Sequence, residues 1–111
     1  MTNPIMTPAE IQNLKTKAFK LARQAEILMV GAAGDRQCAQ THPKLSDNKR
    51  KTYLRDARKA YKQAADLYFE AGNLLQEYLN NDPQAVRFGI WNYIPEAWQL
   101  KARACYLAAK V

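Results

Sequence analysis

The chain has 111 residues, a length that suits one domain and is too short for two separate cores. Hydrophobic residues make up 48%, many of them Ala, Leu and Tyr rather than the β-branched residues typical of strands, so we expect an all-α fold. With 17 Lys and Arg against 10 Asp and Glu, the formal net charge is +7, which favours acidic partners such as nucleic acid.

The chain ends and the cysteines suggest a simple organisation. We expect residues 1–6 to be a flexible tail and residues 7–111 a single helical-bundle domain. The first ten residues lack the features of an export signal and no apolar run is long enough to cross a bilayer, which predicts a cytoplasmic protein without a membrane partner. Cys38 and Cys105 fit no metal-binding spacing, so reduced thiols are expected, with a disulfide as the alternative. We expect no cofactor or metal.

The first predicted helix begins after Thr7, a hydroxyl cap followed by Pro8 at the first helical position and Glu10 three residues after the cap. We expect it to end at about Val30, because Gly31 weakens the helix, although it could resume for two turns. Its apolar residues recur at steps of three and four: Ile11, Leu14, Ala18, Leu21, Ala25 and Leu28.

The second predicted helix starts at a cap on Ser46 or Asp47 and ends near residues 80–83. Its apolar residues have the same spacing: Leu54, Ala57, Tyr61, Ala64, Tyr68, Ala71, Leu75 and Tyr78. Alternating Tyr and Ala let a neighbouring helix approach at each Ala while the rings fill the space beside it, so this edge is predicted to pack. The alternative is that the tyrosines are half exposed and form a groove for another helix.

The third predicted helix is interrupted between Gly89 and Pro95, and Pro95 suits the first turn of its final segment. Its predicted core edge consists of Ile90, Tyr93, Ala97, Leu100, Ala104, Leu107 and Val111. Short connections make neighbouring helices antiparallel. We therefore expect an antiparallel up-down bundle of three long helices, the third interrupted near Gly89–Pro95.

Two segments resemble known helical-hairpin modules. Ala57, Tyr61 and Ala64, and again Ala64, Tyr68 and Ala71, resemble the small-large-small pattern of tetratricopeptide repeats. The segment "AWQLKARACYLAA" (97–109) is similar to these repeats and to the microtubule-interacting-and-transport domains. The resemblance implies a module without catalytic residues that binds peptides or helices of other proteins.

Basic residues gather at the start of the second helix. Lys51, Arg55, Arg58 and Lys62 follow steps of four, three and four and so form one stripe, and the antiparallel arrangement places Arg103 at the same end of the bundle. Arg36 and Lys110 are expected there too. An ordinary solvated face is one interpretation. The other is a binding site for an acidic protein segment or a phosphate backbone.

Two further groups of residues suggest functional sites. Trp91, Tyr93 and Trp98 surround the break in the third helix, where they either fill the end of the bundle or form an aromatic interaction patch, for a partner or for a homodimer. Arg36 and His42 resemble the Arg-x5-His motif of helical-bundle ribonucleases.

These patterns predict a non-enzymatic interaction or adaptor module that binds an acidic or helical segment of a protein partner. The alternative is a nucleic-acid-associated protein that contacts phosphates through the basic stripe. A ribonuclease is a distant third.

Overall fold

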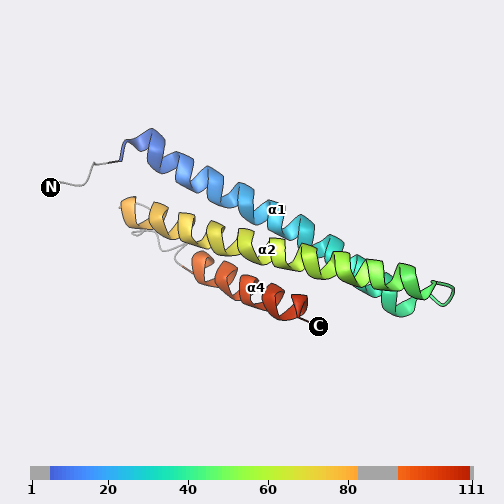
Figure 1. Ribbon diagram of the computed structural model, residues 1–111. Coiled ribbons are helices and arrows are strands. Elements are labelled where there is room, and N and C mark those ends of the chain that lie inside the picture. Colours follow the sequence, from blue (N-terminus) through green and yellow to red (C-terminus); the bar gives the residue numbers. More distant parts are fainter. Residues whose placement is uncertain (1–5, 83–92, 111) are drawn as a thin grey trace.

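The computed structural model describes residues 6–82 and 93–110, which form three helices and, within these ranges, no strand. They are α1 (Pro8–Thr41), α2 (Asp47–Asn81) and α4 (Ile94–Ala109) (Figure 1). Helices α1 and α2 are antiparallel, and α4 runs antiparallel to α2. The predicted all-α up-down bundle is confirmed.

The starts of α1 and α2 follow from their capping residues. Thr7 Oγ1 accepts a hydrogen bond from the Glu10 amide over 3.2 Å and donates one to the Glu10 carboxylate over 3.1 Å. Ser46 Oγ accepts from the Lys49 amide over 3.3 Å, so Ser46, rather than Asp47, caps α2. Both caps satisfy amides that have no partner inside the helix.

Helix α1 is longer than the sequence suggests. The prediction that it ends near Val30 is wrong, because α1 continues without a break through Gly31 and Gly34 to Thr41. A glycine inside a helix costs about 1 kcal/mol relative to alanine. Ala32 and Ala39 remain buried in this part of α1, at 0% and 1% exposure, so packing against α2 offsets that cost.

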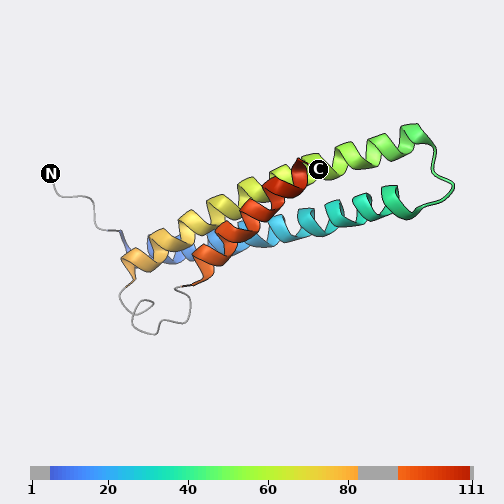
Figure 2. The ribbon, with the colours of Figure 1, turned by 90° about the horizontal axis from the view of Figure 1, so that it is seen from below.

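Helix α2 is the central helix, since both α1 and α4 pack along it (Figures 1 and 2). It runs unbroken through Gly72, which is buried. A Cβ atom at Gly72 would lie 3.2 Å from the Pro95 carbonyl oxygen and 3.4 Å from Gln99 Cγ. Gly72 therefore lets the first turns of α4 approach the backbone of α2 closely.

Helix α4 begins at Ile94 with Pro95 in its first turn, as predicted. Gly89, Ile90 and Trp91 lie outside the described residues. The predicted core edge of α4 is wrong, because Tyr93, Leu100 and Leu107 are exposed by 57% to 66%. The buried residues of α4 are instead Pro95, Trp98, Ala102 and Cys105.

The molecule is elongated, with extents of 61 × 26 × 20 Å. Helix α4 has 16 residues and α2 has 35, so α4 covers only part of the hairpin. Its last turn lies beside Tyr61 of α2. Residues 37–60, which we call the hairpin tip, extend beyond it as two helices and their turn (Figure 2).

No helix in the described part of the chain has the length and apolar character that crossing a membrane requires.

Candidate functional site

A groove runs between the outer helices α1 and α4, and Tyr61 and Tyr68 of α2 form its floor. At one end Phe19 of α1 meets Trp98 of α4 edge to face, with ring centroids 5.2 Å apart. At the other end the Arg36 guanidinium donates a hydrogen bond to the Ala108 carbonyl oxygen. Ala108 follows Trp98 by ten residues, which corresponds to about 15 Å along the helix, or roughly three turns. We call this feature the α1–α4 groove.

The half of the α1–α4 groove near the C-terminus of α4 is apolar. It is a hollow of 370 Å³ lined by Met29 and Val30 of α1, Tyr61 of α2, and Ala104, Cys105 and Ala108 of α4. Cys105 is 2% exposed, and burial raises the pKa of its thiol. A protonated, buried thiol acts as a small apolar side chain. This half of the groove therefore suits aliphatic groups.

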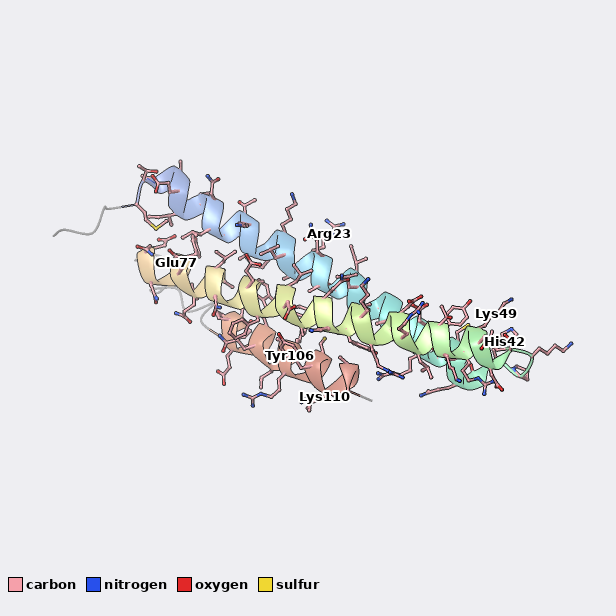
Figure 3. The ribbon with its side chains drawn as sticks, viewed as in Figure 1. Arg23, His42, Lys49, Glu77, Tyr106 and Lys110 are labelled. Carbon is pink, nitrogen blue, oxygen red and sulfur yellow. The ribbon has the colours of Figure 1, made fainter. Side chains whose placement is uncertain are left out.

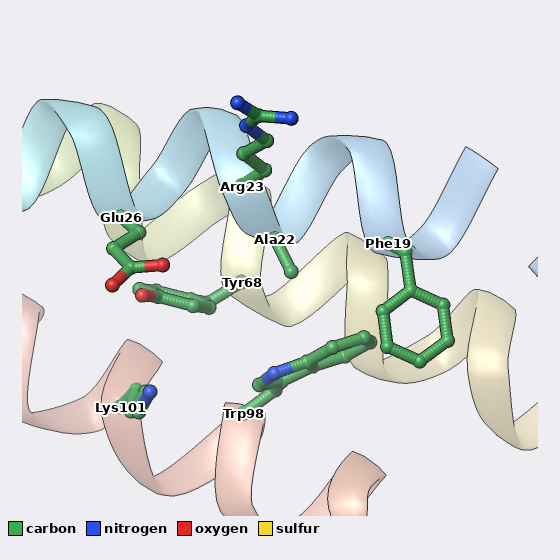
Figure 4. A pocket seen from close by; sticks show the side chains of 7 residues that line it. All are labelled: Phe19, Ala22, Arg23, Glu26, Tyr68, Trp98 and Lys101. Carbon is green, nitrogen blue, oxygen red and sulfur yellow. The ribbon is translucent and has the colours of Figure 1, made fainter. Parts of the chain in front are cut away.

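The other half of the α1–α4 groove is more polar. It is a pocket of 190 Å³ whose lining includes Phe19 and Glu26 of α1, Tyr68 of α2, and Trp98 and Lys101 of α4 (Figure 4). Tyr68 is 1% exposed, yet its hydroxyl has no hydrogen-bond partner. Burial, and secondarily the nearby Glu26 carboxylate, raise the pKa of Tyr68. The hydroxyl is therefore a buried, protonated donor.

Cations lie over the rings of three of the four tyrosines of α2. Arg36 Cζ lies 4.7 Å from the centroid of Tyr61, Lys101 Nζ 5.6 Å from that of Tyr68, and Lys15 Nζ 6.0 Å from that of Tyr78. These are distances at which a cation is attracted by an aromatic face. Tyr61, Tyr68 and Tyr78 are all buried, so the alternative of half-exposed tyrosines is wrong, although Tyr61 and Tyr68 do line a groove.

Large aliphatic side chains are exposed on both outer helices, α1 and α4. They are Ile27 and Val30 of α1 and Leu100 and Leu107 of α4, each exposed by 57% to 64%. Val30 shares the apolar hollow with Ala104, which lies between Leu100 and Leu107 on α4. We call these four residues the aliphatic face. Such a gathering of exposed apolar side chains is a sign of a protein-interaction site.

Three basic and two acidic side chains line the polar pocket and a further hollow on the other flank of α4. Arg23 and Lys101 line the polar pocket, and Arg103 lies beside Leu100 on the other flank of α4. Lys20 of α1 and Lys110, the C-cap residue of α4, are also exposed. The acidic side chains are Glu26 in the polar pocket and Glu96 in the hollow that Arg103 and Leu100 line. A ligand with negative charge along its edges would therefore match this surface.

The basic stripe lies mainly on the hairpin tip. Lys51, Arg55, Arg58 and Lys62 are all exposed. Arg55 pairs with Asp56 over 3.8 Å, with both side chains more than half exposed. Figure 3 shows His42 and Lys49 at this end of the molecule and Glu77 at the opposite end of α2. The stripe is thus a solvated basic surface, which stays a predicted binding site.

Arg103 does not share this end of the molecule. It lines a hollow with Phe69, Asn73 and Tyr106, two turns or more along α2 from Lys62. Beside it, the Tyr106 hydroxyl donates a hydrogen bond to the Asp66 carboxylate. The antiparallel arrangement brings Arg103 to the middle of α2 because α4 ends beside Tyr61 and never reaches the hairpin tip.

The structure separates the residues of the predicted aromatic patch. Trp98 is 8% exposed and packs on Phe19, so it belongs to the core. Tyr93 is 66% exposed at the start of α4. Trp91 lies outside the described residues.

The other candidate residues have structural surroundings. The Arg36 guanidinium is held between Tyr61 and Ala108, while His42 is exposed at the C-cap of α1. Cys38 and Cys105 are both free thiols. Within residues 6–82 and 93–110, no group of three or more His, Cys, Asp or Glu side chains is placed to hold a metal ion.

Comparison of the chain with models of protein families, with curated proteins and with solved structures finds no match in any of the three.

The sequence does not reveal the aliphatic face or the Tyr68 pocket. Helical spacing alone predicts that Leu100 and Leu107 belong to the core. The signal that could have corrected this lies in the same segment: Pro95, Trp98, Ala102 and Cys105 have a three-four-three spacing of their own and include the largest side chain.

Proposed function

We propose that this protein is a non-enzymatic interaction module that binds an amphipathic helix of a protein partner along the α1–α4 groove, with acidic residues on the flanks of that helix. The supporting observation is the aliphatic face, whose four large side chains are each more than half exposed on two neighbouring helices. Binding an amphipathic helix would remove them from water, and apolar anchors at helical spacing are the usual contacts of this mode.

The charge of the surface favours an acidic partner helix over a second copy of this chain. Arg23 and Lys101 line the polar pocket with Glu26, and Arg103 and Glu96 lie beside Leu100, so the basic side chains outnumber the acidic ones by one. Two copies would set like charges against each other, which opposes association. Acidic flanks on a partner would instead pair with these cations and fix the register of the helix.

The test is a display library of 18-residue amphipathic helices with Leu fixed along one face and the flanking positions varied among Glu, Gln and Lys. We expect the selected peptides to carry Glu on the flanks and to bind with micromolar dissociation constants. In a Leu100→Gln/Leu107→Gln variant the affinity should fall at least tenfold, because two exposed apolar anchors are lost. Since both residues are exposed, circular dichroism should show an unchanged fold.

A matched control changes charge and leaves the aliphatic face intact. The variant with Lys51, Arg55, Arg58 and Lys62 replaced by Gln should bind the selected peptides within about twofold of the natural chain, because the contact is mainly apolar. Selection of no peptide, or of Lys-flanked peptides, would refute the proposal. Sedimentation that shows a dimer of the natural chain and a monomer of the Leu100→Gln/Leu107→Gln variant would refute it as well.

Nucleic-acid binding is the second candidate, favoured by the exposed basic stripe on the hairpin tip. Fluorescence anisotropy of a labelled 20-nucleotide RNA and a 20-base-pair DNA duplex tests it across a salt series. Phosphate contacts require affinity that falls log-linearly with salt and is lost in the four-Gln variant. That result would replace the first proposal if the peptides fail to bind.

A further inference from the structure

The α1–α4 groove holds one polar group that packing does not explain. The Tyr68 hydroxyl is buried, lines the 190 Å³ pocket and has no hydrogen-bond partner. By contrast, the hydroxyl of Tyr78 donates to Asp82 over 2.8 Å, and that of Tyr106 donates to Asp66. A buried hydroxyl without a partner is costly, and phenylalanine would fill the same space without that cost. Its position in a pocket indicates a ligand that supplies the acceptor.

The surroundings of Tyr68 define the chemistry of that ligand. Figure 4 shows the hydroxyl end of Tyr68 pointing toward the Glu26 carboxylate, with Lys101 on the α4 side and the Trp98 and Phe19 rings at the far end of the pocket. The pocket thus presents a neutral donor next to a charged acceptor. A group that accepts from Tyr68 and donates to Glu26 satisfies both at once.

We propose that the Tyr68 pocket binds the side-chain carboxamide of a Gln or Asn on the partner helix, whose carbonyl oxygen accepts from the Tyr68 hydroxyl and whose amide group donates to Glu26. This inference rests on the proposed function and names the anchor residue of the partner. A carboxylate that accepts from Tyr68 would lie beside the Glu26 carboxylate as a like charge, a repulsion that Arg23 and Lys101 on the pocket walls only partly offset. An aliphatic anchor would leave the hydroxyl without an acceptor.

The size and walls of the pocket agree with this anchor. Pockets for drug-sized ligands and cofactors are usually about 300–1,000 Å³. The 190 Å³ here suits a single side chain, whose methylene groups would lie against Trp98 and Phe19. Glu26 and Lys101 line the pocket from opposite sides of Tyr68 and are both exposed (Figure 4). Their side chains can therefore rotate to admit the carboxamide.

The test uses propionamide, which carries the end of a Gln side chain, with propionate and propylammonium as charged probes of similar size. Binding is followed by the shift of the Trp98 indole N–H resonance, assigned with a Trp98→Phe variant. Propionamide should bind with a dissociation constant in the millimolar range, as expected for so few atoms, and the charged probes at least tenfold more weakly. Equal shifts with all three probes, or none with propionamide, would overturn the inference.

Three variants test the assigned contacts. Tyr68→Phe should abolish the propionamide shift and leave the melting temperature of the unliganded protein unchanged or higher, because the hydroxyl has no partner there. A clear drop in melting temperature would show that the hydroxyl is bonded within the folded chain, which contradicts the inference. Glu26→Ala should weaken propionamide at least fivefold, whereas Glu96→Ala, the same charge change on the other flank of α4, should not.

These outcomes separate the inference from the proposed function. If the selected helical peptides bind and propionamide does not, the aliphatic face is a docking site and the carboxamide anchor is wrong. If propionamide binds and no peptide does, the carboxamide site is supported and the proposal of a helical partner is refuted. A peptide that carries Gln at the anchor position should bind the natural chain at least fivefold better than its Glu twin, and Tyr68→Phe should remove that preference.

Discussion

The hairpin tip and the part of the hairpin covered by α4 are built from the same two helices but have different cores. Beneath α4 the buried residues include Tyr68, Leu75 and Trp98. In the hairpin tip only Ala39 and Ala57 are buried. Seven of the 17 basic residues lie in the tip, against two acidic ones. We therefore expect the part of the hairpin covered by α4 to contribute most of the stability, whereas the hairpin tip carries most of the excess positive charge.

The largest expected effect tests that difference by removing one leucine from each region. Leu75 is 0% exposed, so Leu75→Ala should lower the free energy of unfolding by about 3 kcal/mol. Leu54 in the tip is half-buried, and Leu54→Ala should cost about 1 kcal/mol. Urea unfolding followed by circular dichroism measures both. Equal losses would mean that the tip is as tightly packed as the rest.

A second prediction concerns the close approach of α4 to α2. Gly72→Leu would push a side chain against the Pro95 carbonyl oxygen, which lies only 3.2 Å from the position that a Cβ atom would take. We expect it to destabilise the protein by about 2 kcal/mol, as overpacking usually does. If α4 is displaced, the tryptophan emission should shift to longer wavelength. Unchanged stability and emission would show that α4 can adjust its position without loss.

The smallest effect is expected at Gly31, where nothing lies within 4 Å of an added Cβ. Gly31→Ala should stabilise the protein by about 0.5–1 kcal/mol, because alanine favours the helix and meets no obstacle. Thermal unfolding should show a higher midpoint. A lower midpoint would mean that α1 needs the glycine for its path along α2.

The comparison also separates what the sequence can predict from what it cannot. Helix starts follow from local chemistry, so the roles of Thr7 and Pro95 are predicted correctly and the cap of α2 is narrowed to Ser46 or Asp47, of which the structure has Ser46. The end of α1 is not, because the weakening effect of Gly31 is local and the compensating burial of Ala39 depends on α2. Local propensity and tertiary packing disagree there, and packing determines the result.

Helix α4 carries two sets of apolar residues at helical spacing, and only one of the two sets is buried. Tyr93, Leu100 and Leu107 form the more aliphatic one, while Trp98, Ala102 and Cys105 form the one that is buried. Periodicity cannot rank two helical stripes on one helix. The close approach at Gly72 brings the first turns of α4 onto α2, and this contact joins residues far apart in the chain. The spacing pattern alone therefore cannot predict the candidate site.

The elongated shape has a consequence for how the protein would approach an acidic molecule. A rod with extents of 61 × 26 × 20 Å that carries excess positive charge at one end has a large permanent dipole moment. In the field of an acidic protein such a rod turns before it touches, with the hairpin tip leading, and steering of this kind raises association rates. The tip would then meet an acidic molecule first, while the aliphatic face lies farther back along the rod.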